Sequence, residues 1–483
     1  ACFEDMLTRY SAVDTFHGRG GRTDRQPDET CFPDGLFWPR QMVANVARWE
    51  QWLADTLMTD IVDTETPDPV PLLAETDDSL TTSDELGSYK WGKNDGEYLY
   101  LLYLLDGDGT DPGDVVPVYI GESTDISSRL GQHSRKIRES LPLEAWADDG
   151  SWGSFSKYDH MATVYQQASG PLYAWIYELD ENTRGPYGHP TYRQELEAKL
   201  VGLVESLEQY DRVFANREFV PNQTLYEIGQ AGPDWLATEP TFERTAAPGQ
   251  LREEPSASKV ELWNDWLENY LLSDLQSHDT NDPIHLFETD ESGQVRLTDT
   301  GRLARSAAID DRIRREGRKC VGEAGIRDDS YEGLLYIMYQ LAAPVAEATP
   351  ADIIPRYIGK AEAYGKKREL SSNFTEIAQD RTATRSFARW GDGDYWHIGE
   401  LSMSLLGDDE RKQHWADALF ESGSRQLSQP TYLWVHAWHS ETDTSPYDLP
   451  LTLAAVEPLL IGLAHAASPQ TLLNQEGVPS TDT

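Results

Sequence analysis

Apolar residues recur at helical spacing in two distant parts of the chain. Trp49 and Leu53 belong to a Trp-x-x-Trp-Leu motif, and Trp263 and Leu267 belong to a second copy of it. Side chains three and four residues apart share one face of an α-helix, so each copy predicts an amphipathic helix.

Three pairs of short apolar runs follow these two helices in the same order. They are rich in aromatic and β-branched residues, which is typical of buried strands. The pairs are residues 98–105 and 334–341, 118–121 and 356–359, and 172–177 and 432–437. A predicted helix then begins at Glu197 in the first series and at Glu457 in the second, and Asn216 or Asn474 closes each series.

The chain is therefore interpreted as a diverged duplication. We expect a basic amino-terminal arm over residues 1–40, a first repeat over 41–225, a linker over 226–258 and a second repeat over 259–483. The linker is rich in Ala, Gly, Pro and Glu and shows no periodicity. The order of elements predicts an α/β (α+β) fold, in which each repeat is a small mixed or antiparallel sheet flanked by helices.

The amino-acid composition indicates that this chain folds in a salt-rich solution. The 483 residues include 83 acidic and 41 basic side chains, a net charge of -42, and 39% hydrophobic residues are too many for a disordered acidic chain. So much negative charge repels itself strongly in dilute buffer. We expect a halophilic protein of a salt-rich cytoplasm; the alternative is an acidic protein that binds cations or basic partners.

Cysteine usage and hydropathy exclude several other classes. The three cysteines have no metal-ligand spacing, which argues against a disulfide framework and a zinc finger. The first residues lack the basic and apolar regions of a signal peptide, and no stretch approaches the roughly 18 apolar residues of a membrane span. We therefore expect a cytoplasmic protein with no membrane partner.

Five residues of the first repeat suggest a specific chemistry. Tyr100 and Tyr119 lie on the first two predicted strands, and Arg129 follows Tyr119 by ten residues on a predicted helix. Glu197 and Asn216 complete the series. This order resembles that of the GIY-YIG nuclease family. The matching residues of the second repeat are Tyr336, Tyr357, Glu457 and Asn474, with Lys367 at the position of the arginine and Arg368 directly after it.

Three positions depart from the family pattern. The glycine of the first half-motif is replaced by Tyr98 in the first repeat and by Leu334 in the second. Glu122 directly follows the second half-motif of the first repeat, where phosphate should approach. A lysine at position 367 cannot offer the bidentate fork of an arginine.

The resemblance implies hydrolysis of a phosphodiester bond with a divalent cation, Mg²⁺ (or Mn²⁺), held by Glu197 and by Glu457. It also implies that Tyr100 acts as the general base, that Tyr119 orients the water or the phosphate, and that Arg129 stabilises charge on the phosphate. These residues also have structural interpretations, because tyrosines pack in strands, glutamates favour helix starts and asparagines hold turns.

The positions of other polar residues predict further roles. His133, one helical turn after Arg129, is a candidate for proton transfer or phosphate contact. His160 and His397 lack ligand spacing and are interpreted as core or turn residues. Basic residues expected to contact phosphate are Arg135, Lys136 and Arg138 near the first site, Lys360 and Lys366 near the second, and Arg312, Arg314 and Arg315 between them.

Together these features predict a Mg²⁺-dependent DNA endonuclease, with RNA as the alternative substrate and defence against foreign DNA as the expected role. A monomer with pseudo-twofold repeats, or a homo-oligomer, would allow cuts in both strands. One alternative is a nucleic-acid-binding protein whose sites have lost activity. The other is a structural, self-assembling protein with many exposed tryptophans.

Overall fold

The computed structural model describes most of the chain after residue 36. The described residues are 37–62, 69–76, 79–83, 86, 96–107, 109, 111–141, 155–168, 170–220, 228, 257–277, 283–321, 330–364, 370–378, 387–407, 409–439, 442–449 and 451–478. Nearly all of the predicted arm and linker lie outside these residues.

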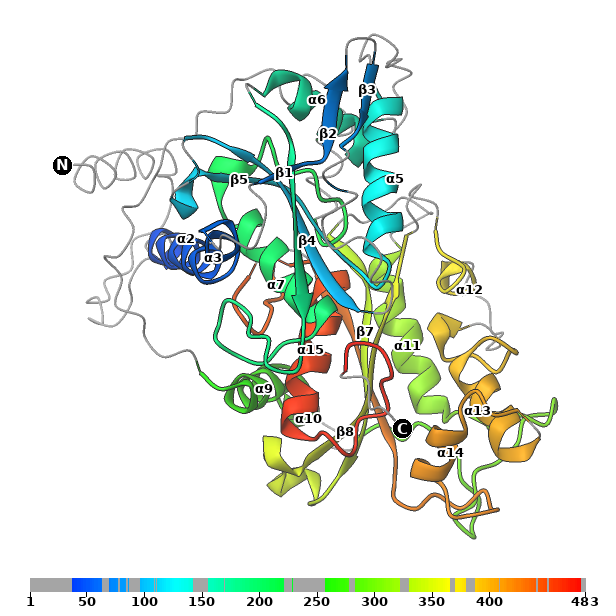
Figure 1. Ribbon diagram of the computed structural model, residues 1–483. Helices are drawn as coiled ribbons and strands as arrows, with labels where there is room; N and C mark the ends of the chain where they lie inside the picture. Colours follow the sequence, from blue (N-terminus) through cyan, green and yellow to red (C-terminus); the bar gives the residue numbers. More distant parts are fainter. Residues whose placement is uncertain are drawn as a thin grey trace, which may run out of the picture. The chain divides into compact units, whose positions relative to one another are not determined.

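The first sheet has four strands in the order β1-β6-β4-β5, and every neighbouring pair is antiparallel (Figure 1). The strands are β1 (Val70–Pro71), β4 (Glu97–Leu105), β5 (Val115–Ser123) and β6 (Tyr173–Leu179), and β2 (Leu73–Thr76) and β3 (Ser79–Thr82) form a separate hairpin. Every residue of β4 from Tyr98 to Tyr103 is buried, so both faces of the sheet are covered.

Five helices accompany this sheet. They are α2 (Phe37–Asp55), α3 (Leu57–Val62), α5 (Ile126–Glu139), α6 (Lys157–Gln167) and α7 (Arg193–Glu205). α5 begins where the Asp125 side chain accepts a hydrogen bond from the Ser128 amide, and α6 begins at a capping box of Ser156 and Asp159. α5 and α6 pack on each other and on β5, whereas α7 packs on β4 and β5.

The second sheet has three antiparallel strands in the order β8-β7-β9. They are β7 (Tyr331–Leu341), β8 (Ile353–Glu362) and β9 (Tyr432–His439). The accompanying helices are α9 (Lys259–Leu267), which continues through a π-helical turn (Glu268–Leu272) into α10 (Ser273–Ser277), and α11 (Ala307–Cys320), α12 (Thr375–Ala378), α13 (His397–Leu406), α14 (Gln413–Leu419) and α15 (Leu453–Ala467).

Alternate residues of β7 enter two different hydrophobic cores. Leu335 and Ile337 belong to a core shared with α9 and α15. Leu334 and Tyr336 belong to a core shared with α11, α13 and α14. The two-residue period of a strand therefore distributes one apolar run between the two layers of helices.

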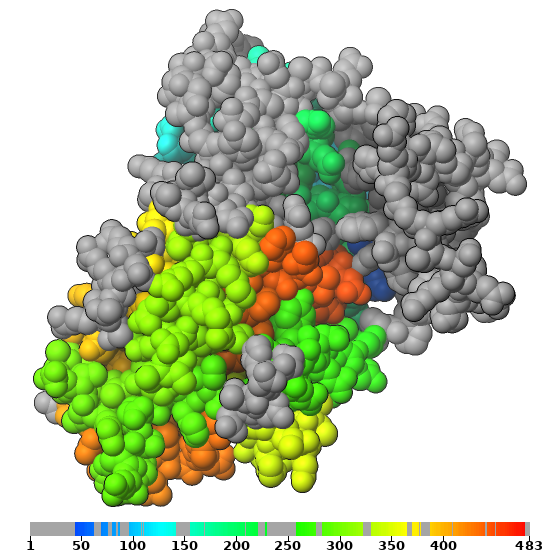
Figure 2. Space-filling model, turned by 180° about the vertical axis from the view of Figure 1, so that it is seen from behind, coloured from blue at the N-terminus to red at the C-terminus, as the bar shows by residue number. Residues whose placement is uncertain are grey.

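Residues Val43–Thr483 form one compact unit, in which α7 packs against α15. Glycines permit this approach, because a Cβ at Gly202 would lie 2.7 Å from a methyl of Leu451, and one at Gly462 would lie 2.5 Å from the Glu195 carboxyl carbon. α15 also packs against α9, whose green surface lies near the orange-red surface of the C-terminal part of the chain in Figure 2.

A buried ionic cluster lies beside this helix contact. Glu195 of α7 is fully buried and accepts hydrogen bonds from Lys199 Nζ at 2.7 Å and from Lys259 Nζ of α9 at 2.8 Å. The two lysines lower the pKa of Glu195 against the opposing effect of burial. Burial lowers the pKa of Lys199 to about 8.

The observed elements confirm a mixed α/β architecture of small antiparallel sheets and helices, and each predicted strand is present. Nine tryptophans of the described residues are interior, whereas the self-assembly alternative expects exposed ones. Those at most 4% exposed are Trp49, Trp52, Trp175, Trp263, Trp266, Trp390, Trp415, Trp434 and Trp438. They fill the cores because an indole ring buries a large apolar area. None of the described helices is long and apolar enough to cross a membrane.

Candidate active site

The first tyrosine of the predicted site lies opposite a glycine on the neighbouring strand. Tyr100 on β4 pairs with Gly121 on β5, and a Cβ at Gly121 would overlap the Tyr100 hydroxyl. The glycine is therefore required because the phenol ring crosses its backbone. The Tyr100 hydroxyl lies 2.8 Å from His133 Nε2 of α5.

Tyr119 and His133 both lie next to the Tyr100 ring. The Tyr100 and Tyr119 rings are stacked with centroids 6.0 Å apart, and His133 lies 4.9 Å from Tyr119. All three side chains are at most 1% exposed. Burial raises the pKa of both tyrosines and lowers the pKa of His133 to about 3, so the imidazole is neutral at physiological pH.

Two cations border these rings. Interaction with the Arg129 guanidinium lowers the pKa of Tyr100 against the larger effect of burial. Lys157, the first residue of α6, donates a hydrogen bond to the Tyr119 hydroxyl at 2.9 Å and lies 3.8 Å from Glu218. We call Tyr100, Tyr119, Arg129, His133 and Lys157 the first cluster.

Glu197 is a buried carboxylate beside the first cluster. It is 6% exposed and makes no hydrogen bond or ion pair with the described residues. Burial raises its pKa well above the usual range, Glu122 and Glu218 add to the shift, and Lys157 and Arg129 oppose it. Arg193, one helical turn before Glu197, forms an ion pair of 2.5 Å with Glu122, which draws Glu122 toward the same face of α7.

Asn216 positions the strand that carries Tyr119. Its side-chain amide accepts a hydrogen bond from the Ile120 amide at 2.9 Å and donates one to the Ile120 carbonyl at 2.8 Å. Asn474 makes the same pair of bonds to Ile358 on β8, at 3.0 and 2.8 Å. Both asparagines hold the backbone and do not contact the tyrosine hydroxyls.

The second sheet repeats the tyrosine arrangement. Tyr336 on β7 pairs with Gly359 on β8, where a Cβ would lie 2.5 Å from the Tyr336 ring, and the Tyr336 and Tyr357 rings are stacked 6.3 Å apart. A histidine again contacts both rings: His397 Nε2 lies 3.3 Å from the Tyr336 hydroxyl, and its ring lies 5.2 Å from Tyr357. The Tyr336 hydroxyl also donates to the Lys360 carbonyl at 3.1 Å.

Cations border the second pair of tyrosines as well. Interaction with Arg389 lowers the pKa of Tyr336 against the larger effect of burial, and Lys412 Nζ lies 5.6 Å from the centre of the Tyr357 ring. We call Tyr336, Tyr357, Arg389, His397 and Lys412 the second cluster. The residues expected there from sequence, Lys366, Lys367 and Arg368, lie outside the described residues.

Glu457 occupies the place of Glu197 beside the second cluster. Burial raises its pKa to about 7, while the Lys360 ammonium and backbone amide oppose the shift. Lys360 itself forms an ion pair of 2.9 Å with Glu362. The charged group that most affects Glu457 is therefore a cation, whereas the one that most affects Glu197 is an acid.

The exposed basic residues of α5 are paired with an acid. Arg135 and Lys136 lie 3.8 and 2.7 Å from Glu139, and Arg138 Nε donates to the Ser134 carbonyl at 3.3 Å. A phosphate contact at these positions would have to compete with Glu139.

The basic residues of α11 differ from the expectation of a phosphate-binding surface. Arg312 is 6% exposed, donates to the Val435 carbonyl at 3.0 Å and pairs with Asp274 at 2.6 Å. Arg314 and Arg315 lie 2.9 and 3.6 Å from the carboxylates of Asp311 and Glu316. Arg312 is not available to a ligand because α11 turns this side chain against β9.

The metal-ligand residues available at each cluster are few. Among the described residues, no group of three or more histidine, cysteine or acidic side chains could hold a metal ion. Mg²⁺ commonly takes only one or two protein carboxylates and completes its shell with water. Glu197, a buried carboxylate with no partner among the described residues, fits such a cation.

Four functional candidates were not identified from the sequence: Lys157, Arg389, His397 and Lys412. His397 was interpreted as a core residue, and it is buried, yet its ring contacts both tyrosines of the second cluster. The two lysines approach the tyrosines through tertiary packing and have no sequence signal. His160, by contrast, bonds the Arg212 carbonyl and Arg217, and contacts neither tyrosine of the first cluster.

No family model matches the chain, and neither a curated protein nor a solved structure matches it.

Proposed function

We propose that the protein is a Mg²⁺-dependent DNA endonuclease built from two GIY-YIG-like domains, each centred on one tyrosine cluster. The observation that carries the proposal is the convergence of Tyr100, Tyr119, Arg129 and His133 around one pair of rings, with the buried Glu197 beside them. These residues come from two strands and two helices, and apolar side chains would fill such a position if packing were their only role.

The chemistry of the first cluster suits phosphodiester hydrolysis. Glu197 would hold the cation, whose charge stabilises the leaving oxygen. The Arg129 guanidinium lowers the pKa of Tyr100 and offers two parallel donors to the phosphate. His133 stays neutral and orients the Tyr100 hydroxyl. Once Tyr100 has released its proton to solvent, its phenolate, stabilised by Arg129 and the cation, would accept the proton of the attacking water.

The second cluster supports a tandem arrangement. Its strands have the same cross-strand pairing of tyrosine with glycine, and its asparagine makes the same two backbone bonds. α7 and α15, which carry Glu197 and Glu457, pack against each other. Two sites related in this way would cut both strands of a duplex.

A second candidate is a nucleic-acid-binding protein without hydrolytic activity. It is favoured by Glu122, which adds to the negative charge beside Glu197, and by the burial of Tyr100 and Tyr119. Such a protein would bind a duplex in molar salt with no turnover.

The test is cleavage of supercoiled plasmid in molar KCl with Mg²⁺. We expect nicked and linear products from the wild type and none from the Glu197→Gln, Glu457→Gln double variant, which keeps the shape of both buried side chains. Linear product that appears directly, without accumulation of nicked plasmid, would indicate that both sites cut in one encounter. Equal cleavage by the wild type and the double variant would refute the proposal. Binding of duplex without any cleavage would favour the second candidate.

A further inference from the structure

The turn that carries Arg389 has a strained backbone. Ala388 and Arg389 have φ angles of 46° and 69°, a region that residues with a Cβ rarely adopt. A residue with a Cβ is strained there, and such strain is retained mainly where the surrounding structure enforces it. The Arg389 side chain is nevertheless exposed rather than buried.

Several contacts enforce this turn, η10 (Phe387–Arg389). Phe387 is fully buried, and the guanidinium groups of Arg305 and Arg314 lie 5.4 and 5.5 Å from the centre of its ring. Arg305 also donates to the Trp390 carbonyl at 2.5 Å, and the Ala388 amide donates to the Asn373 carbonyl at 3.1 Å. Both sides of the strained pair are therefore fixed, and Arg389 is presented from a rigid turn.

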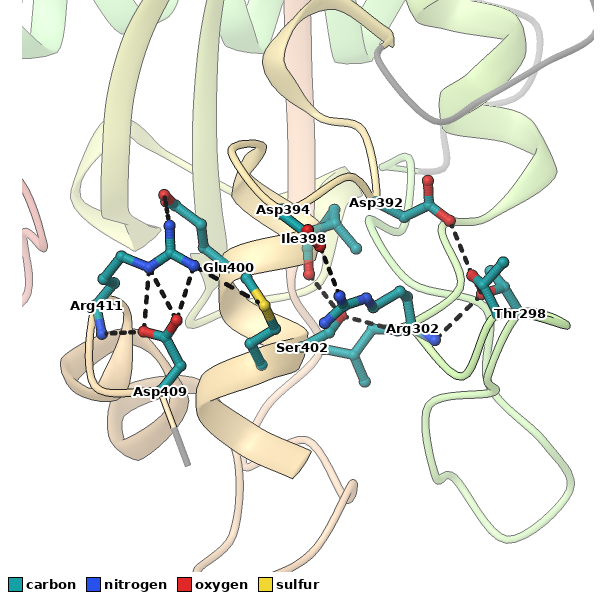
Figure 3. Close-up of polar contacts among 12 residues, drawn as sticks. Thr298, Arg302, Asp392, Asp394, Ile398, Glu400, Ser402, Asp409 and Arg411 are labelled. Atoms are coloured by element: carbon teal, nitrogen blue, oxygen red, sulfur yellow. Dashed lines mark hydrogen bonds and ion pairs between the residues drawn. The ribbon is translucent and has the colours of Figure 1, made fainter. Parts of the chain in front are cut away.

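The helix that carries His397, α13, packs in the same hydrophobic core as Phe387 of the turn. Figure 3 shows Arg302 directed at Asp394, which lies three residues before α13 begins, with 2.8 Å between Nη2 and Oδ1. Ser402 of α13 accepts a hydrogen bond from the Leu303 amide at 2.9 Å. Gly399 is required in α13 because a Cβ there would overlap the carbonyl oxygen of Gly393.

Lys412 is positioned by α13 in turn. Its amide donates to Ser404 Oγ at 3.0 Å. The adjacent Arg411 side chain is instead engaged by Asp409 and Glu400, as Figure 3 shows. The Lys412 ammonium lies 4.1 Å from the centre of the Trp415 ring and 5.6 Å from that of Tyr357. It makes no ion pair with the described residues.

Two cations beside the second pair of tyrosines have no carboxylate partner among the described residues, although acidic residues outnumber basic ones by 83 to 41 in the sequence. Arg411 has two carboxylate partners, yet Arg389 and Lys412 have none among the described residues. Both lie beside the Tyr336–Tyr357 pair, in the same way as Arg129 and Lys157 lie beside the Tyr100–Tyr119 pair.

We propose that Arg389 and Lys412 form the anion-binding pair of the second cluster and bind a phosphate group, free or in a phosphodiester. They supply the guanidinium and the ammonium that α5 and α6 supply in the first cluster, but from a strained turn and from the residue before α14. The second site therefore takes its two cations from different elements than the first. The phosphodiester assignment rests on the proposed function; anion binding does not.

Calorimetric titration with inorganic phosphate, at constant KCl, tests the pair without cleavage. The starting protein carries Arg129→Met, which removes the guanidinium of the first cluster, so that the measured phosphate binding comes from the second cluster. We expect Arg389→Gly or Lys412→Met to weaken phosphate binding about tenfold or more, because each removes a charge-assisted hydrogen bond. Arg411→Met is the matched control: it removes the same charge from the adjacent residue and should leave the affinity unchanged. No phosphate binding before Arg389 is changed, or equal losses in all three variants, would overturn the proposal.

Two further measurements separate a functional arginine from a structural one. Arg389→Gly should raise the melting temperature while it weakens binding, because glycine adopts positive φ without strain. Ala388→Gly should keep the phosphate affinity. A lower melting temperature for Arg389→Gly would mean that the side chain serves the fold, and would refute the proposal.

A titration with DNA distinguishes binding of free phosphate from binding of a phosphodiester. A labelled duplex is titrated in Ca²⁺, which is used in place of Mg²⁺ to limit cleavage. Parallel losses for phosphate and duplex support binding of the backbone, whereas retained duplex affinity would limit the pair to free phosphate. In Glu197→Gln protein with Mg²⁺, Arg389→Gly should abolish the remaining cleavage and the double substitution of Lys367 and Arg368 by alanine should not. If the wild type does not cleave at all, the proposed function fails while the phosphate titration still decides this inference.

Discussion

Removal of Glu195 should destabilise the protein far more than the loss of two exposed hydrogen bonds would. Glu195 is fully buried and is the anion that two ammonium groups share, at 2.7 Å to Lys199 and 2.8 Å to Lys259. In Glu195→Ala, the fully buried Lys199 has no anion beside it, so it must either remain an unpaired charge or give up its proton on folding. Loss of one partner from a buried pair costs about 3–5 kcal/mol, which is a large part of the 5–15 kcal/mol that stabilises a typical domain.

Urea unfolding in molar KCl measures this cost, because urea leaves the ionic strength unchanged. The matched control is Glu139→Ala, which removes an ion pair of the same 2.7 Å length between exposed side chains. The Glu139 variant should unfold at the urea midpoint of the wild type. Equal midpoints for the Glu195 and Glu139 variants would refute the argument, because burial would then have no effect on the pair.

A second variant separates the cost of an unpaired charge from the worth of the pair. The positions of α15 that match Glu195 and Lys199 are Ala455 and Leu459, so the fold tolerates apolar residues there. The variant with Glu195→Ala, Lys199→Leu and Lys259→Met should recover most of the lost stability. A triple variant as unstable as Glu195→Ala would show that packing, not charge, explains the loss.

Three other predictions concern the whole fold. With a net charge of -42, the midpoint of thermal unfolding should rise between dilute buffer and molar KCl, and a midpoint independent of salt would contradict the halophilic interpretation. Burial lowers the pKa of His160 to about 3 from 6.5, so its contribution is present at pH 7 and lost as the pH falls below 6.5. From pH 7 to pH 5, the wild type should lose about 2 kcal/mol more unfolding free energy than His160→Gln, measured by urea titration. Gly131→Ala on α5, where a Cβ meets nothing within 4 Å, should raise the free energy of unfolding by about 1 kcal/mol. Gly462→Ala should lower it by about 1–3 kcal/mol, because the methyl group meets the fixed Glu195 carboxylate. Shifts of the same sign would contradict the packing of α7 on α15.

The strands could be predicted from the sequence because their side chains are buried on both faces. Runs such as those of β4 and β7 are apolar without alternation, and aromatic residues mark them as strands rather than helices. The pairing of Tyr100 with Gly121 and of Tyr336 with Gly359 also agrees with the motif spacing. These features depend on residues close together in sequence, where local pattern is informative.

The second cluster could not be predicted in the same way, because spacing places the arginine at Lys367 or Arg368, whereas Arg389 is brought to Tyr336 by a strained turn. That turn depends on Phe387 packing between two arginines from α11 and from the residues before it. Neither Phe387 nor Arg389 belongs to a periodic pattern. The expectation for Arg312 failed for a related reason, since a basic residue on an amphipathic helix can face either side.

The asparagine that ends each series also protects the sheet. β5 and β8 are the outermost strands of their sheets, and their free backbone groups are where another chain could add a strand. Asn216 occupies both backbone groups of Ile120, and Ala215 bonds the Val118 carbonyl at 2.7 Å. Many proteins guard such edges by charge repulsion, which salt screens within a few ångströms. Hydrogen bonds from an asparagine side chain to the edge strand are not screened by salt. They can therefore protect this acidic chain from aggregation at salt concentrations at which its net charge no longer keeps copies apart.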